Sequence, residues 1–297
     1  MYNKKMLHII SYANHTKNDG YKNFVNSMDK YNFKYKIIGD GEIWEGFHTK
    51  MKACLKELLF YKDTDIVTIV DCFDVMANRE GMDILKLRFL KYKKPVVFGA
   101  ENRIYLNDEG HNYIKQKKWW NKNESIYNRN VNNCSLNGGT VIGYVFMLKK
   151  IIKWSLDNKY TDDQLAYHMY LEEYPDDAAL DLSSSIFGNY NLSSSIFVNY
   201  TGLDMRRFNK NNNNDIIDVR SMYNPIFIHI PGAKIDLFYR MNWIGGIILG
   251  DKYIGDSTLI HLMKNKYFLI CVLILIVLVS IYVWYKNKNK TLAVKNN

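Results

Sequence analysis

The sequence predicts an α/β fold in which helices flank a Rossmann-like, mostly parallel sheet. Two observations support this prediction. Short apolar runs alternate with helical patterns, and the strongest of these runs ends in two acidic residues. Buried parallel strands appear as continuous apolar runs, and their alternation with helices is typical of a doubly wound sheet. Residues 1–265 of the 297 are available to this fold, which is enough for a hydrophobic core.

The spacing of apolar residues places the individual elements. The predicted strands are 6–12, 35–39, 65–70, 95–99, 138–147 and a last run that ends at His229. The predicted helices are 20–30, 49–61, 148–157 and 162–173, where apolar residues recur at helical spacing. Ligands of such sheets bind outside the carboxyl ends of the strands, so the residues that follow the strands are the candidates for function.

The overall charge of the chain does not indicate a nucleic-acid partner. Formal net charge is +10, but the 40 Lys and Arg residues are scattered rather than clustered, which favours a solvated basic surface. Four cysteines (Cys54, Cys72, Cys134 and Cys271) show no close pairing. They therefore form neither a disulfide framework nor a zinc pattern.

The C-terminal region differs in character from the rest of the chain. Residues 267–285 form a 19-residue run without a charge, with aromatic residues at its ends and lysines beyond them. At a rise of about 1.5 Å per residue, such a helix crosses a hydrocarbon core of about 30 Å. We expect a globular domain over 1–265, a transmembrane helix over 266–286 and a basic tail over 287–297. A single-pass C-terminal anchor of this kind slightly favours the cytosolic side for the globular domain.

The sharpest chemical feature is the sequence IVDCFD at residues 69–74. A strongly apolar strand ends there in Asp71 and, three residues later, Asp74. Two neighbouring carboxylates repel each other unless a cation joins them. Their hard oxygen atoms suit Mg²⁺ or Mn²⁺, ions that commonly bridge a nucleotide diphosphate. Two Asp residues after a strand also occur in ordinary loops, so the pair needs a third partner.

His229 is the candidate third ligand. It ends an apolar strand and is followed by Pro231 and Gly232, which turn the chain, and then by Lys234. A histidine at a strand end is often purely structural, but together with two carboxylates it favours Mn²⁺ over Mg²⁺. Lys234 could neutralise a phosphate as a point charge.

Three further features each have an ordinary structural interpretation. Gly138 and Gly139 let the backbone approach a ligand closely, or simply form a tight turn. In the sequence TDDQ at 161–164, Thr161 can cap a helix whose first turn holds the two acidic residues. Residues 182–191 and 192–201 match at eight of ten positions, which indicates a local duplication that lengthens a strand and loop.

Taken in order, these segments resemble the glycosyltransferase domain of the procollagen lysyl hydroxylase family, and more distantly the collagen galactosyltransferases. The resemblance runs from about Leu7 to about Trp243. The segments that carry it are 20–24, 39–44 (GDGEIW), 71–74 (DCFD), 98–101 (FGAE), 136–139 (LNGG), 162–164 (DDQ), 186–187 (IF) and 229–234.

The resemblance implies a GT-A-type fold that uses Mn²⁺ and a UDP-sugar donor. Its metal ligands map onto Asp71, Asp74 and His229. Its donor-binding positions map onto Ser11, Trp44, Lys50, Phe73, Gly232 and Lys234, with Phe73 stacking on the uracil. Its catalytic positions, which face the sugar and the acceptor, map onto Glu101, Asn137, Asp162 and Asp163.

The function implied by the resemblance is transfer of a sugar from a UDP-sugar to a protein hydroxyl. The acceptor would be hydroxylysine or galactosyl-hydroxylysine in a collagen-like chain. The turn at 229–232 departs from the family pattern, and this leaves a second hypothesis open: a non-catalytic, membrane-tethered module that binds sugar or collagen. A composition rich in Lys, Asn and Ile is compatible with an origin in a large DNA virus.

Overall fold

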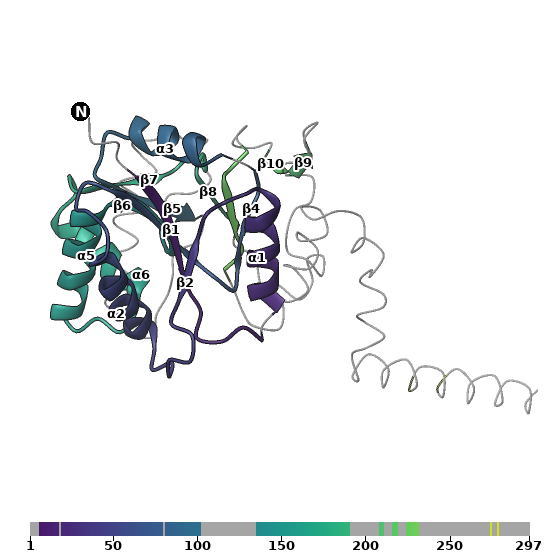
Figure 1. Cartoon of the computed structure of the whole chain (residues 1–297), viewed down its shortest axis with the longest axis horizontal. Coiled ribbons are helices and arrows are strands. Elements are labelled where there is room, and N and C mark those ends of the chain that lie inside the picture. Colours follow the sequence, from purple (N-terminus) through teal and green to yellow (C-terminus); the bar gives the residue numbers. More distant parts are fainter. Residues whose placement is uncertain are drawn as a thin grey trace, which may run out of the picture. The chain divides into compact units, whose positions relative to one another are not determined.

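The computed structural model describes most of the N-terminal two thirds of the chain. The described residues are 6–17, 19–79, 81–101, 135–190, 208–210, 216–218, 224–231, 274 and 278. The chain divides into two compact units, Met1–Gly250 and Asp251–Asn297. The sheets and helices described below belong to the first unit (Figure 1).

A six-stranded mixed sheet forms the centre of the first unit, in the order β2-β1-β3-β6-β5-β7. Its strands are β1 (Leu7–Tyr12), β2 (Lys36–Ile38), β3 (Ile66–Asp71), β5 (Val96–Glu101), β6 (Ser135–Tyr144) and β7 (Ala178–Asp181). Strand β6 pairs antiparallel with β3 and β5, while the other neighbours pair parallel. Five of the six strands therefore run in one direction, which confirms the predicted mostly parallel sheet.

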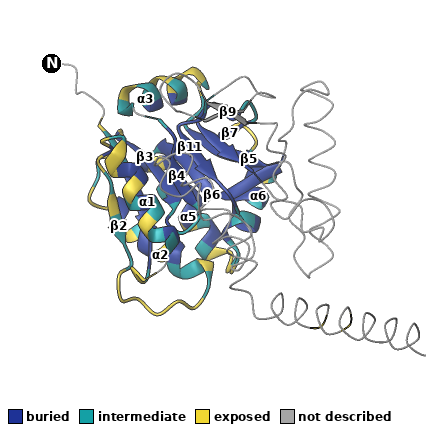
Figure 2. Ribbon diagram, turned by 90° about the vertical axis from the view of Figure 1, so that its right-hand side faces the viewer, coloured by how far each residue is buried: buried dark blue, intermediate teal, exposed yellow. Residues whose placement is uncertain are grey.

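Helices cover both faces of this sheet (Figure 1). One face carries α2 (Phe47–Leu58), α5 (Val145–Asp157) and α6 (Asp163–Glu173), and the other carries α1 (Asp19–Lys30) and α3 (Met82–Lys91). Side chains of β3 alternate between the two cores: Val67 and Ile69 enter one, and Ile66 and Val70 the other. Figure 2 shows the central strands as mostly buried, which explains why their sequences are largely apolar runs.

A second sheet of three short strands lies on the side of α1 and α3. It is formed by β4 (Val75–Ala77), β8 (Phe187–Asn189) and β11 (Phe227–His229), in the order β4-β11-β8. Strand β11 pairs antiparallel with β4 and parallel with β8, so that His229 lies opposite Val75 on one side and Asn189 on the other. A separate pair, β9 (Phe208–Lys210) and β10 (Ile216–Asp218), is antiparallel.

Most predicted elements are found in the structure, but the predicted strand over 138–147 is wrong at its end. Strand β6 stops at Tyr144, and α5 begins at Val145. Val145 and Met147 are buried whereas Phe146 is 47% exposed, so the first turn of α5 imitates the alternation of a strand. Thr161 is not the helix cap either: Asp162 caps α6, and its carboxylate accepts a hydrogen bond from the Leu165 N–H at 2.8 Å.

The turn between β7 and β8 is organised by the buried carboxylate of Asp181. It accepts hydrogen bonds from the backbone N–H groups of Ser185, Ile186 and Phe187 at 2.9, 2.6 and 2.7 Å. It also accepts one from the Tyr92 hydroxyl at 2.5 Å. Because these donors lead directly into β8, Asp181 determines where that strand begins.

The predicted membrane segment, residues 267–285, lies outside the described residues except for Ile274 and Leu278. Within the part of the chain that the structure describes, no helix is both long and apolar enough to cross a membrane. The transmembrane helix therefore stays a prediction from sequence.

We expect the substitution Asp181→Asn to lower the free energy of unfolding by about 2–3 kcal/mol, because an amide removes acceptors and leaves buried N–H groups unpaired. Chemical denaturation of the full chain measures this loss. The exposed Asp176, which pairs with Lys94 at 3.1 Å, provides the control. Asp176→Asn should change stability by less than about 0.5 kcal/mol. Equal effects of the two substitutions would contradict the role of Asp181.

Candidate metal centre

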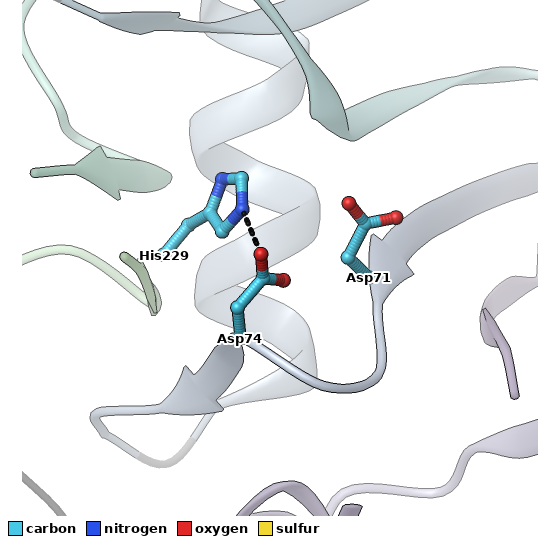
Figure 3. Close-up of side chains that lie close together, drawn as sticks. All are labelled: Asp71, Asp74 and His229. Carbon is cyan, nitrogen blue, oxygen red and sulfur yellow. Dashed lines mark ion pairs between the residues drawn. The ribbon is translucent and has the colours of Figure 1, made fainter. Parts of the chain in front are cut away.

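Three side chains from separate strands converge in the first unit (Figure 3). Asp71 is the last residue of β3, Asp74 immediately precedes β4, and His229 ends β11. One ligand atom from each lies within 4.8 Å of the other two, and His229 Nε2 is 3.2 Å from Asp74 Oδ2. Around an octahedral ion with bonds of about 2.1 Å, adjacent ligands are about 3 Å apart and opposite ones about 4.2 Å. Small side-chain rotations would bring the three onto one ion.

The backbone pairing of β4 and β11 explains why residues 155 positions apart meet at this site. His229 lies opposite Val75 in the antiparallel register. The Ile230 N–H donates to the Asp74 carbonyl at 3.0 Å, which extends the pairing by one step. The structure thus brings together the three ligands that the sequence predicted.

Two observations indicate that the site suits a cation. The Asp74 Oδ1 atom is buried and has no hydrogen-bond partner among the described residues. Gly139 lies beside the ligands: a Cβ there would stand 2.6 Å from Asp71 Oδ2 and 2.5 Å from His229 Cε1. Any side chain at position 139 would therefore fill the space between two ligands. The residues present fit a small divalent ion with oxygen and imidazole ligands.

The charge of the site also favours a cation. Lys50 is buried, and its ammonium pairs with Asp71 Oδ1 at 2.8 Å and with Asp163. Burial raises the pKa of Asp163 to about 6, even though Lys50 acts in the opposite direction. Burial also raises the pKa of Asp71, and the neighbouring charge of Asp74 adds to this effect. A cation bound between these carboxylates would favour their ionised forms and oppose the effect of burial.

Lys50 is the main positive charge in the described part of the site. Burial lowers its pKa, but the attraction of Asp163 and Asp71 outweighs burial and holds the pKa well above its usual value. Its ammonium therefore stays protonated. The sequence assigned Lys50 to donor binding, and the structure places it between a metal-ligand candidate and a catalytic candidate.

Glu101, Asn137 and Gln164 form a connected group next to the metal site. The Gln164 amide donates to Glu101 Oε1 at 2.7 Å and accepts from the Gly138 N–H at 2.9 Å. Asn137 donates to Glu101 Oε2 at 3.4 Å and accepts from the Gly139 N–H at 3.0 Å. Gln164, which sequence analysis left without a role, therefore connects α6 to the end of β5.

The two glycines that follow Asn137 lie within strand β6 rather than in a tight turn. Phe98 on β5 pairs with Val141 on β6, but the next residue, Gly99, pairs with Asn137. The register between the two strands is therefore irregular at this point. A Cβ at Gly138 would lie 2.8 Å from the Gln164 backbone, so α6 packs directly against β6 there. The irregularity thus places both glycines beside the site.

Aromatic side chains of two loops lie at the carboxyl end of β1. Trp44 is 44% exposed and contacts Tyr12 and Phe47, with ring centroids 5.7 and 5.5 Å apart. Phe73 stacks on His15 at 5.0 Å. Partly exposed rings such as Trp44 and Phe73 offer flat surfaces for a planar ligand. Binding of the donor base by Phe73 remains a prediction.

The remaining predicted residues are less directly connected to the metal centre. Ser11 is buried, and its hydroxyl donates to the Val70 carbonyl at 2.6 Å, one residue before Asp71. Asp162 caps α6, as described above. Gly232 and Lys234 lie outside the described residues. Their proposed roles in donor binding or catalysis stay predictions.

Asn189, whose side chain contacts His229, belongs to no motif that predicts a function. The His229 Nδ1 and Asn189 Oδ1 atoms are 2.7 Å apart, and both residues are buried. Asn189 lies in the first copy of the internal repeat, in a strand of only three residues. The one signal for it in the sequence is that the second copy also has Asn, at position 199.

Comparison with known families identifies the domain. Residues 3–249 match the family described as PLOD GT domain. The chain belongs to this family. It therefore contains a glycosyltransferase domain, as the order of its motifs predicted, and the family's domain ends close to the boundary of the first compact unit.

Relatives include a human protein and a viral one. The human multifunctional procollagen lysine hydroxylase and glycosyltransferase LH3 is 26% identical over 261 residues, which is 82% of this chain and 32% of that protein. An uncharacterized protein of Acanthamoeba polyphaga mimivirus is 26% identical over 258 residues, or 84% of this chain and 50% of that protein. The chain thus spans about a third of the human relative and half of the viral one, and a large-virus homologue exists.

Among solved structures, a glycosyltransferase involved in the glycosylation of the major capsid of PBCV-1 aligns with this chain. The alignment covers 80% of this chain and 99% of that one, with a TM-score of 0.49 and 9% sequence identity.

We expect Mn²⁺ to stabilise the full chain against unfolding. At about 100 times its dissociation constant, a bound ligand adds about 2.7 kcal/mol. Asp74→Asn should remove this stabilisation because it neutralises one ligand. Thermal unfolding with and without Mn²⁺ measures the effect. The matched control is Asp157→Asn at the exposed end of α5, which should keep the full Mn²⁺ shift. The same shift in the Asp74→Asn variant would exclude this site.

Proposed function

We propose that this chain transfers a sugar from a UDP-sugar to a protein hydroxyl, with Mn²⁺ held by Asp71, Asp74 and His229. One observation carries the proposal: these three side chains converge in a partly buried site that has an excess of carboxylates. Membership of the PLOD GT domain family supports the transferase class. Asp71, Asp74 and His229 would hold such an ion, and its positive charge would stabilise the charge that develops on the departing UDP.

Lys50 has a second role in this proposal. In the structure its ammonium neutralises Asp71 and Asp163. If a bound dication neutralised Asp71, the Lys50 ammonium would be available to a donor phosphate. Lys50 can therefore exchange one anionic partner for another without leaving the site.

Asp163 is our candidate for accepting the proton of the acceptor hydroxyl. A general base works best when its pKa lies near the working pH, and the pKa of Asp163 is raised to about 6. Its carboxylate is 3% exposed and pairs with Lys50. Donation of Lys50 to a phosphate would free that carboxylate. Glu101 and Asn137, which are also buried, would orient the sugar beside it.

The acceptor we propose is hydroxylysine or galactosyl-hydroxylysine in a collagen-like chain. The name of the human relative LH3 combines procollagen lysine hydroxylase with glycosyltransferase, which motivates this choice of acceptor. We retain the single-pass anchor formed by residues 267–285 as part of the proposal, because its 19 residues carry no charge.

We expect the purified chain to release UDP from one or more UDP-sugars when Mn²⁺ is present. A panel of UDP-sugars, measured with and without a hydroxylysine peptide, tests this. Asp74→Ala should reduce turnover about 100-fold or more, because the metal no longer holds the diphosphate in position. Asp157→Asn again serves as the control and should keep full activity.

Absence of turnover with every donor, in a chain that still binds Mn²⁺, would overturn the enzymatic proposal. It would favour the second hypothesis, a binding module without catalysis. Retention of turnover by a folded Asp74→Ala variant would instead show that the assigned metal ligands are wrong.

A further inference from the structure

The two ring nitrogens of His229 face different partners. Nε2 lies 3.2 Å from Asp74 Oδ2, and Nδ1 lies 2.7 Å from Asn189 Oδ1. The parallel register of β8 and β11 aligns Asn189 with His229, so the contact follows from the backbone pairing. Asn189 is fully buried. Its side chain is therefore held in a defined place beside the ring.

The orientation of the Asn189 amide is fixed by its other contact. Its Nδ2 donates to the Ala100 carbonyl at 3.2 Å. The reversed amide would place two oxygens against each other there, without a hydrogen between them. The Thr140 hydroxyl lies 3.4 Å from Asn189 Oδ1 and can donate to it in this orientation. The atom that faces the imidazole is consequently an oxygen.

An amide oxygen only accepts hydrogen bonds, so the ring nitrogen beside it must carry the hydrogen. With a cation on Nε2, the hydrogen of neutral His229 would therefore lie on Nδ1. Without one, the Asp74 carboxylate is a competing acceptor 3.2 Å from Nε2. Metal-binding histidines generally donate their second ring N–H to a neighbouring acceptor, which fixes the tautomer and the orientation of the ring. Asn189 satisfies this description.

We propose that Asn189 is a positioning residue that holds His229 in the Nδ1–H tautomer and presents Nε2 to the metal. This inference rests on the proposed metal-dependent function and adds a residue that supports it. Asn189 does not touch the ion itself. It acts through His229, in a chain of contacts that begins at the Ala100 carbonyl on β5 and ends at the metal site.

The internal repeat shows which copy can supply this residue. Both copies contain the Asn, at positions 189 and 199, but the second has Val198 where the first has Gly188. A Cβ at position 188 would come within 2.6 Å of the Tyr190 hydroxyl and 2.8 Å of Pro225 Cγ. A valine does not fit in this strand without a shift. Asn199 is therefore the natural control for Asn189.

Three variants of the full chain test the inference. Asn189→Leu removes the acceptor, Asn189→Asp keeps an acceptor toward Nδ1, and Asn199→Leu makes the same change in the second copy. Electron paramagnetic resonance of free Mn²⁺ measures affinity without requiring turnover. We expect Asn189→Leu to weaken Mn²⁺ binding by about 10–100-fold, the usual effect of losing such a partner. Asn189→Asp should keep most of the affinity, and Asn199→Leu all of it.

A second measurement reports the tautomer directly, in the chain saturated with diamagnetic Mg²⁺ in place of Mn²⁺. Two-bond ¹H–¹⁵N spectra at a pH where the imidazoles are neutral distinguish Nδ1–H from Nε2–H. His229→Gln identifies the signal of this ring among the seven histidines. We expect the Nδ1–H pattern in the unsubstituted chain and in Asn199→Leu. The pattern should be lost in Asn189→Leu.

The outcomes separate this inference from the proposed function. An Nε2–H pattern in the unsubstituted chain would overturn the inference, and so would unchanged Mn²⁺ affinity in Asn189→Leu, while the function would stand. Equal losses in the two Leu variants, or in a folded Asn189→Asp, would also overturn it. If the chain binds no Mn²⁺ at all, the proposed function fails, and this inference fails with it. If Asn189→Leu does not fold, Asn189→Asp decides.

Discussion

The site depends on one structural constraint, the docking of β11 between β4 and β8. This pairing alone brings His229 beside Asp74 and Asn189. The strand has only three residues, so its backbone hydrogen bonds are few. Burial provides most of its stabilisation, since Ile226, Phe227, Ile228 and Ile230 have no solvent exposure. Each such side chain contributes about 1.5–3 kcal/mol relative to exposure. The position of an imidazole is thus fixed by apolar packing on either side of it.

The same fold tolerates an unfavourable concentration of negative charge. Asp71 and Asp163 share one buried lysine, and desolvation of the two aspartates raises their pKa values. A site optimised for stability alone would contain fewer carboxylates or more cations. Functional sites are where proteins commonly depart from such optimisation. The imbalance is the feature that a dication would correct, and it supports the metal-dependent function more directly than the shape of the sheet does.

Sequence reasoning located the parts of the site that follow long apolar strands. The strand over 65–70 and the acidic pair after it were predictable because four buried apolar residues, Ile66, Val67, Ile69 and Val70, leave a clear pattern. Strands β4 and β8 were not, since three residues show no periodicity. The boundary at Val145 was missed because a buried helical turn imitated strand alternation. Asn189 could not be found because its importance comes from the register between β8 and β11, and pairing partners are not visible in a single sequence.

The differences between the two copies of the internal repeat explain how a strand as short as β8 can still form at one defined place. Two copies with the same eight residues would compete for the place beside β11, and competition of this kind weakens a unique fold. The differences between the copies remove it. Asp181, which precedes the first copy and binds three backbone N–H groups, corresponds to Asn191 before the second copy. Gly188, which sits against Pro225, corresponds to Val198. The residues that differ, rather than those that match, therefore identify the copy that builds the site.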